Sequence, residues 1–352
     1  MAKPNLLDLA YPALGAELAA WGEPPYRADQ VWAWAWAKLA ADFGAMTDLP
    51  RPLRDRLSAR FDLGAPEVVG AASDADGTEK ALLRLADGQR VEAVLIREGD
   101  RRTVCVSTQV GCPVGCPFCA TGRMGFVCDL TAGEIAAQVL QFARELQVAG
   151  ERVTHVVLMG MGEPLLNYDA TRQAVRNLND GRGFGLGARR ITVSTAGVVP
   201  AIWRLAGEGL QVNLAVSLHA PDDALRGKLV PLGERWPIAD VLSAADHYAE
   251  VTGRRVSYEY VLLHDVNDGQ HHARSLARLL RGRLAHVNLI PFNPAPGLPF
   301  GRPDSRTVDA FRRELVLQGV DATVRRSRGA EIQAGCGQLR CGGPLGPMPA
   351  SA

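Results

Sequence analysis

The sequence predicts an α/β fold in which a mostly parallel sheet, covered by helices, forms a partial (β/α)6 barrel. Continuously apolar strands that alternate with helical patterns are typical of a parallel sheet buried on both faces. The six candidate strands, most of them apolar and bounded by Gly, Pro or Asn, cover residues 103–109, 155–159, 190–194, 212–218, 256–263 and 285–290. Catalytic groups of such folds lie at the carboxyl ends of the strands.

The helices between these strands are predicted from their amphipathic patterns and their caps. The clearest covers Thr131 to Ala149, where Thr131 and Glu134 have capping-box spacing ahead of an apolar face. A helix of this length can cover the sheet between the first and second candidate strands.

Residues 1–64 are predicted to form a small N-terminal helical domain. An apolar and aromatic face runs from Trp21 to Leu39, and a second candidate helix follows Pro52. Seven basic and seven acidic residues balance over residues 1 to 60, so packing against the barrel and contact with RNA are both open roles for this domain.

Residues 65–100 show short alternating runs that are separated by turn residues, among them Asp87 and Gly88. This pattern predicts a β-hairpin linker. The same segment carries Glu92. Residues 101–345 then form the predicted barrel together with a C-terminal extension that carries Cys336.

Composition excludes several protein classes. With 352 residues, 47% hydrophobic and 22% charged, the chain is too long for a disulfide-framed scaffold and too apolar for a disordered protein. The net charge of +1 gives no overall field for nucleic acid or membranes. No apolar run approaches the roughly 18 residues of a membrane span, and the first thirty residues lack a signal-peptide pattern. We therefore expect a cytoplasmic protein without a membrane segment.

The seven cysteines are unevenly placed along the chain. Disulfides are unusual in a cytosolic chain of this length, so clustered thiols favour a metal, a redox pair or catalysis. Five lie in one stretch and two near the end: Cys105, Cys112, Cys116, Cys119 and Cys128, then Cys336 and Cys341.

Cys112, Cys116 and Cys119 have CxxxCxxC spacing directly after the first candidate strand. A structural zinc would need a fourth close ligand, and only Cys128 is available nearby. Three thiolates also suit a four-iron cluster in which one iron stays open to bind a reactant. Zinc and plain buried thiols remain the alternatives at this point.

This spacing, placed after the first strand of a six-unit barrel, resembles the radical S-adenosylmethionine superfamily. The resemblance implies a [4Fe-4S] cluster on the three cysteines, whose open iron binds S-adenosylmethionine and cleaves it to a 5′-deoxyadenosyl radical. The segment MGMGEP, residues 159–164, follows the second candidate strand where that superfamily binds the methionine amino group. Gly160 and Gly162 in this segment permit close backbone approach.

Further motifs narrow the resemblance to the RlmN family of dual-specificity RNA adenine C2 methyltransferases, almost from end to end. They are WGEPPYRADQVW, VEAVLI, VCVSTQVGCPVGCPFCATG, MGMGEPLLN, STAGVVP, SLHAP, EYVLL followed by VND, NLIPFNP and GCGQL. The resemblance implies that two S-adenosylmethionine molecules are used per turnover. Matched position by position, it also implies S-adenosylmethionine contacts at Gly162, Glu163, Ser194, Ser217, Leu218, His219 and Asn293.

The same resemblance implies the catalytic residues. Cys336 in GCGQL would carry the methyl group, Glu92 in VEAVLI would take the C2 proton of adenine, and Cys105 would resolve a covalent protein–RNA adduct. The flanking Gly335 and Gly337 also predict an accessible and mobile Cys336. Cys128 and Cys341 match no functional position, and we assign both to structure.

The partners are likewise implied by resemblance: 23S rRNA, tRNA next to the anticodon, and an electron donor such as flavodoxin, acting with a monomer. Clustered arginines near Cys336, namely Arg325, Arg326 and Arg328, could contact phosphate. The nearest alternative is the related group that methylates C8 of the rRNA adenosine, although MGMGEPLLN and WGEPPYRADQVW favour C2. An iron–sulfur electron carrier is the remote alternative, since it would need a fourth ligand and no Cys336.

Overall fold

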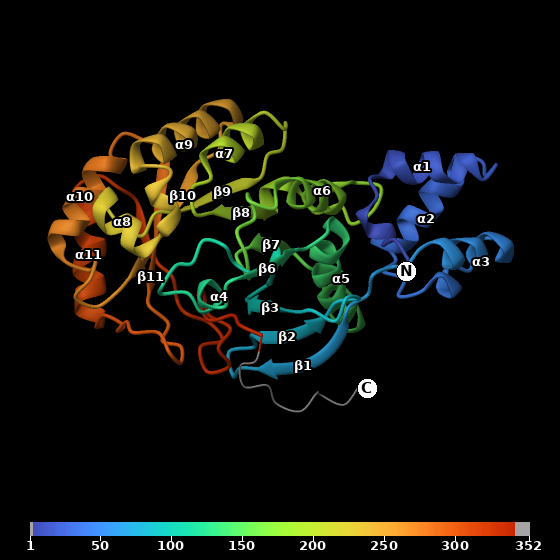
Figure 1. Cartoon of the computed structure of the whole chain (residues 1–352), viewed down its shortest axis with the longest axis horizontal. Coiled ribbons are helices and arrows are strands. Elements are labelled where there is room, and N and C mark those ends of the chain that lie inside the picture. The colour runs from blue at the N-terminus through green and yellow to red at the C-terminus, as the bar shows by residue number, and fades with distance from the viewer. Residues whose placement is uncertain (1–2, 342–352) are drawn as a thin grey trace.

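A computed structural model describes residues 3–341 and contains one large, mostly parallel sheet (Figure 1). Strand neighbours from β1 to β4 run antiparallel, whereas those from β4 onwards run parallel. In spatial order its ten strands are β1 (Glu67–Ser73), β2 (Glu79–Arg84), β3 (Arg90–Glu98), β4 (Arg101–Cys105), β7 (His155–Leu158), β8 (Ile191–Thr195), β9 (Asn213–Ser217), β10 (Val256–Leu262), β11 (Ala285–Pro291) and β12 (Ala322–Val324). The predicted α/β fold with a parallel barrel sheet is confirmed.

The sheet differs from the prediction in three places. A seventh parallel strand, β12, pairs with β11 and extends the barrel. The predicted hairpin contains three strands, and it joins the main sheet because β3 pairs with β4. The first candidate strand ends at Cys105, and Gln109 belongs instead to a separate two-stranded sheet of β5 (Gln109–Gly111) and β6 (Phe126–Asp129).

Helices cover the outside of the parallel sheet (Figure 1). They are α5 (Ala132–Val148), α6 (Tyr168–Asn179), α7 (Val199–Ala206), α8 (Asp223–Leu229), α9 (Ile238–Thr252), α10 (Gln270–Leu280) and α11 (Ser305–Leu317), with 3-10 turns η3 (Ala188–Arg190) and η4 (Pro231–Glu234). The short helix α4 (Ala120–Arg123) lies instead in the loop after β5 and contacts β5. At the start of α5, the Thr131 hydroxyl accepts from the Glu134 backbone N–H, and the Glu134 carboxylate accepts from the Thr131 N–H. The predicted capping box and helix are confirmed.

The N-terminal residues form a helical lobe beside the barrel (Figure 1). It contains η1 (Leu6–Asp8), α1 (Tyr11–Ala20), α2 (Tyr26–Trp36), η2 (Phe43–Ala45) and α3 (Arg51–Arg60). Trp32 and Trp36 of α2 are fully buried in a hydrophobic core that is continuous with that of the barrel. Apolar packing therefore joins the lobe to the barrel.

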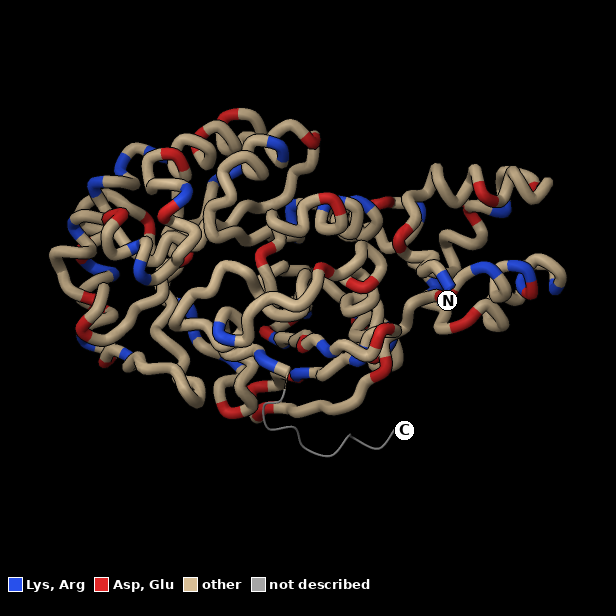
Figure 2. Tube along the Cα trace, viewed as in Figure 1, with Lys and Arg blue, Asp and Glu red and all other residues tan. Residues whose placement is uncertain are grey.

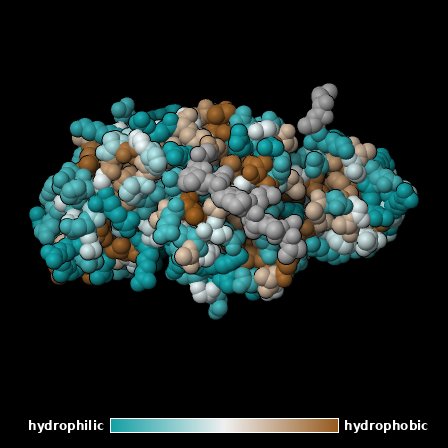
Figure 3. All heavy atoms as spheres, turned by 90° about the horizontal axis from the view of Figure 1, so that it is seen from below, coloured by the Kyte–Doolittle hydropathy of each residue, from teal (hydrophilic) through white to brown (hydrophobic). Residues whose placement is uncertain are grey.

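Lysines and arginines are interspersed with acidic residues along most of the chain (Figure 2). On the face seen in Figure 3, hydrophilic side chains surround separate hydrophobic patches. Among the helices within residues 3–341, none is both long enough and apolar enough to span a bilayer.

Candidate active site

The cysteine loop follows β5 and is fixed by backbone contacts to β6 and to itself. The Cys112 N–H donates to the Gly125 carbonyl at 2.9 Å, and the Cys119 N–H donates to the Cys116 carbonyl at 3.1 Å. Gly111 has φ +74°, and a Cβ there would lie 1.8 Å from the Gly125 oxygen. Only glycine fits at this position, so the residue before Cys112 fixes how the loop leaves the sheet.

Cys112, Cys116 and Cys119 line one cavity at the carboxyl ends of the strands. Burial raises the pKa of the Cys112 thiol to about 12 and that of Cys116 well above its usual range, and neighbouring thiols add to both shifts. Three thiolates in such a place need a positively charged partner, which an iron–sulfur cluster supplies.

The spacing of these thiols bears on which metal centre fits. Within residues 3–341, no three Cys, His, Asp or Glu side chains come close enough to share one metal ion. Sulfurs around a single zinc would be about 4 Å apart. The loop supplies three thiolates, one fewer than a structural zinc site normally has, and three suit a four-iron cluster with one open iron.

The glycine-rich segment after β7 packs tightly against the chain that follows β4. A Cβ on Gly160 would lie 2.7 Å from the Val106 carbonyl group, and a Cβ on Gly162 would lie 2.7 Å from the Gln109 side chain. Gly162 also has φ +103°. These glycines therefore permit a close approach to residues 106–109 of the same chain, whereas their predicted approach to a bound ligand stays a prediction.

Glu163 is buried at the wall of the cluster cavity. Its carboxylate accepts from the Leu165 N–H at 3.0 Å and from the Ala196 N–H at 2.6 Å. Burial raises the pKa of Glu163 to about 7, although these hydrogen bonds act in the opposite direction. The carboxylate is thus held rigidly at the edge of the site, where a cationic amino group would stabilise its charge.

His219 follows β9 and turns its ring into the same cavity. Its backbone is left-handed with φ 60°, and its Nδ1 accepts from the Val261 N–H at 3.0 Å. The ring packs edge-on against Phe118, with ring centroids 5.0 Å apart. Burial lowers the pKa of His219 to about 3, so the imidazole is neutral and Nε2 carries the proton.

The remaining residues predicted to contact S-adenosylmethionine lie in three places: the cluster cavity, the core and a second, adjacent cavity. Ser194 of β8 and Ser217 of β9 line the cluster cavity with Gly162, Glu163 and His219. The Leu218 side chain is instead fully buried in the core. Asn293 lines the adjacent cavity and its amide donates to the Cys336 carbonyl at 3.3 Å.

The adjacent cavity, of about 540 Å³, brings together Cys105 of β4 and Cys336 of the C-terminal segment. This volume is in the range of ligand pockets. Cys336 also lines the cluster cavity, so this residue lies where the two cavities meet. Cys336 is exposed as a residue, but protein atoms surround its thiol, and this desolvation raises the pKa of the thiol. The buried Cys105 has a pKa raised to about 12 by burial and by the neighbouring Cys336.

The sequence did not indicate the positions or partners of two charged residues in this region. Glu259 of β10 is buried at the wall of the cluster cavity, and it accepts from the Asn288 amide at 2.8 Å. Arg325 lines the Cys336 cavity with its Nε 3.8 Å from the Glu259 carboxylate, and Arg328 pairs with Glu98 at 3.1 Å. Arg325 therefore faces inward, which the run of arginines in the sequence did not indicate.

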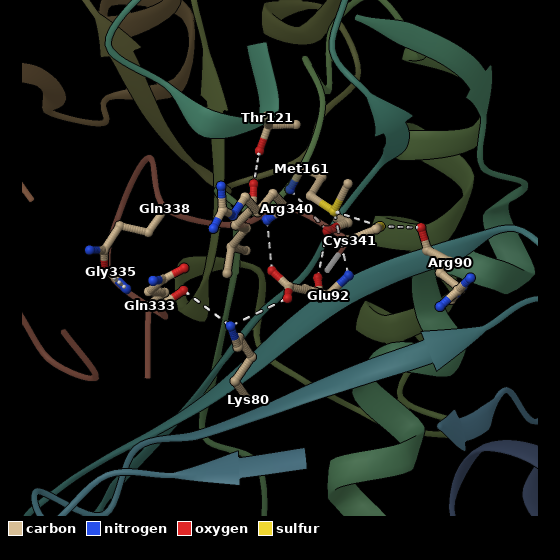
Figure 4. Close-up of polar contacts among 12 residues, drawn as sticks. Lys80, Arg90, Glu92, Thr121, Met161, Gln333, Gly335, Gln338, Arg340 and Cys341 are labelled. Atoms are coloured by element: carbon tan, nitrogen blue, oxygen red, sulfur yellow. Dashed lines mark hydrogen bonds and ion pairs between the residues drawn. The ribbon is translucent and has the colours of Figure 1, made fainter. Parts of the chain in front are cut away.

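Glu92 does not line either of these two cavities. Its side chain is fully buried between β2 and the C-terminal segment, where the Arg340 N–H donates to Oε2 at 2.8 Å (Figure 4). Val94 lies opposite Cys105 in the β3–β4 pairing, so Glu92, two residues before Val94, points to the same side of the sheet as Cys105. Cys341 donates its thiol to the Arg90 carbonyl at 2.7 Å beside this cluster.

The fold and the cysteine loop define a radical S-adenosylmethionine enzyme. Residues 106–277 match the family model described as Radical SAM superfamily, and residues 4–63 match the Ribosomal RNA large subunit methyltransferase N-terminal domain. Members of this superfamily use a [4Fe-4S] cluster and S-adenosylmethionine, and the chain does so as one of them. The three thiols of the cysteine loop fit that cluster.

Comparison with close relatives identifies the family within this superfamily. It is 52% identical to a probable dual-specificity RNA methyltransferase RlmN of Symbiobacterium thermophilum, over 91% of this chain and 86% of the relative. It is 50% identical to a protein of the same description from Chloroflexus aurantiacus, over 95% and 92%. The crystal structure of a radical SAM methyltransferase from Sphaerobacter thermophilus superposes with a TM-score of 0.93 at 54% identity, covering 96% and 99%. The chain belongs to the RlmN family of radical SAM RNA methyltransferases.

Proposed function

We propose that the protein methylates C2 of an adenosine in 23S rRNA and of the adenosine next to the anticodon in tRNA. The observation that carries this proposal is the position of Cys336 at the junction of two cavities, one lined by the three cluster cysteines and one lined by Cys105. A residue that takes a methyl group on one side and delivers it to a base on the other needs such a position.

In this proposal Cys112, Cys116 and Cys119 hold the cluster, and Gly162, Glu163, Ser194, Ser217, Leu218, His219 and Asn293 contact S-adenosylmethionine. When bound, the cluster and its cosubstrate supply the methyl group and a carbon radical. The neutral His219 and the fixed Glu163 carboxylate present one donor and one acceptor to the ligand. Leu218 has its side chain in the core, so any contact from it is made by its backbone.

The chain's own residues then carry the methyl group to RNA. Cys336 receives the methyl group as a thioether. One hydrogen atom of this S-methyl group would pass to the carbon radical, the methylene carbon left behind bonds to C2 of the adenine, and one electron of the adduct would return to the cluster. Glu92 takes the C2 proton. The Cys105 thiol gives up its proton as its sulfur attacks the Cys336 sulfur, the carbon–sulfur bond breaks with its electron pair on carbon, and a proton added to that carbon completes the new methyl group. A Cys105–Cys336 disulfide remains, and its reduction prepares the next turnover.

The target base must leave any stack to reach Cys336, so the substrate is a looped or remodelled adenosine. We further propose that the protein acts in the cytoplasm as a monomer and receives its electrons from a flavodoxin-like donor. Arg326 lines the Cys336 cavity and is a candidate phosphate contact at its rim.

The test is nucleoside analysis by mass spectrometry of 23S rRNA fragments and tRNA incubated anaerobically with reduced, cluster-loaded protein and S-adenosylmethionine. We expect 2-methyladenosine in both RNAs and none with Cys336→Ala. Formation of 8-methyladenosine instead would assign the protein to the C8-methylating reaction. Absence of any methylated adenosine would reject the proposal.

A further inference from the structure

A buried ion pair lies under the loop that carries Cys336. Lys80 of β2 and Glu92 of β3 place Nζ 3.3 Å from Oε1, and the two side chains are 1% and 0% exposed (Figure 4). Burying two charges costs several kcal/mol per ion, and close pairing recovers that cost only in part. Stability alone therefore does not explain why this ion pair is buried, which suggests a further role.

The ion pair holds both ends of the Cys336 loop. Lys80 Nζ donates to the Gln333 carbonyl at 3.4 Å, and Glu92 Oε2 accepts from the Arg340 N–H at 2.8 Å. Gln333 lies three residues before Cys336 and Arg340 four residues after it. The two charges thus connect the strand that carries the proposed base to the loop that carries the proposed methyl carrier (Figure 4).

Lys80 is also the main partner of one carboxylate oxygen. Within residues 3–341, Glu92 Oε1 has no hydrogen-bond donor, so its contact is the ion pair with Lys80. Burial raises the pKa of Glu92, while Lys80 and the Arg340 N–H act in the opposite direction. The Arg340 guanidinium charge also acts to lower the pKa of Glu92. Cys341 is a further titratable group at this spot, and its own pKa is raised to about 11 by burial and by the Glu92 charge.

From these contacts we infer that Lys80 is a positioning residue for Glu92. It keeps the carboxylate ionised and fixed on the side of the sheet that Cys105 shares, and Oε2 becomes free to take a proton when the loop releases the Arg340 N–H. This inference rests on the proposed function, because Glu92 is the base only in that reaction. The sequence alone does not indicate that Lys80 positions Glu92.

The test measures how fast the covalent protein–RNA adduct is resolved in a single turnover of cluster-loaded protein, followed on denaturing gels. In Lys80→Met the carboxyl is more readily protonated, so at pH values below the midpoint of the pH–rate curve we expect resolution about tenfold slower, which corresponds to a pKa change of about one unit. The midpoint of the pH–rate curve should move upward. Methylation of Cys336, read by mass spectrometry, should be retained, and Lys80→Arg should restore resolution.

Asp76→Ala is the matched control. Asp76 accepts from the Gly329 N–H at 3.2 Å, so this change loosens the start of the same C-terminal segment without touching Glu92. We expect wild-type adduct resolution from it. Equal slowing in Asp76→Ala and Lys80→Met would show that only the loop attachment matters, and wild-type resolution in Lys80→Met would also overturn the inference.

Glu92→Gln, measured in parallel, separates this inference from the proposed function. If Glu92→Gln accumulates no adduct, the assignment of Glu92 as base fails. If Glu92→Gln accumulates adduct and Lys80→Met does not, only the inference about Lys80 fails. Should Lys80→Met not fold, Lys80→Gln, which has no charge but still carries a donor for the Gln333 carbonyl, replaces it with the same expected result.

Discussion

Cys105 and Cys336 share a cavity but differ in how they are held. Cys105 is fixed on β4 between β3 and β7, whereas Cys336 lies on a loop between two glycines. The raised pKa of Cys105, about 12, means that it is a thiol at neutral pH, and the nearby Arg325 charge acts in the opposite direction. Because Cys105 is fixed on a strand and Cys336 lies on a loop, Cys105 suits the resolving role better than the role of methyl carrier.

Replacing Cys105 with Ala should trap the protein on its RNA. Without a thiol to attack the Cys336 sulfur, the carbon–sulfur bond persists, and we expect a band that combines protein and RNA on a denaturing gel. Cys128→Ala is the control, since Cys128 lines neither cavity. Absence of a crosslinked band in Cys105→Ala, while Cys336 is still methylated, would remove the resolving role.

Some site residues could be recognised from the sequence and others could not. The cysteine loop has a spacing that few structures other than a metal centre require, and the structure places its three thiols at one cavity. Lys80 and Glu259 are charged residues on strands, and charged side chains normally face solvent. Both are buried because distant segments, at Gln333 and Arg325, close over them. Pattern along one strand carries no information about such partners.

Among the structural elements, the six longer parallel strands were predicted because most of them form apolar runs bounded by turn residues. β12 was missed because it has only three residues, Ala322–Val324, of which one is exposed. A strand this short has no period to detect, and its place is fixed by pairing with β11. Likewise, nothing local shows that the chain after Cys105 leaves the sheet to form β5 and the cysteine loop.

The contact between the β7 loop and residues 106–109 gives a prediction about how elements fix the site. In Gly162→Ala, the new Cβ would lie 2.7 Å from Gln109 on a backbone with φ +103°. We expect a cost of about 2 kcal/mol, and a fall in melting temperature of roughly 5 °C. Gly181→Ala, where no atom lies within 4 Å of the new Cβ, is the control. Equal melting temperatures for the two variants would contradict the tight contact.

Across the whole molecule, polar groups add specific attachments to the apolar contact between the N-terminal lobe and the barrel. The Asn177 amide of α6 donates to the Leu7 carbonyl at 3.1 Å and to the Leu9 carbonyl at 3.0 Å. The Asp8 carboxylate accepts from the Gly133 N–H at 2.6 Å, in the first turn of α5, where the helix dipole favours negative charge. Both attachments involve the segment that connects to α1.

Asn177→Asp is expected to weaken the attachment of this lobe selectively. The variant keeps the side-chain shape but sets a buried carboxylate against two carbonyl oxygens, at a cost of about 3 kcal/mol. Such a cost raises the opened population roughly a hundredfold, so trypsin should cut within residues 1–64 far sooner than in the wild type. Asn179→Asp is the matched control, because the Asn179 amide donates only to the Leu186 carbonyl within the barrel. Equal cleavage of the lobe in both variants would show that apolar packing alone determines how residues 1–64 are held.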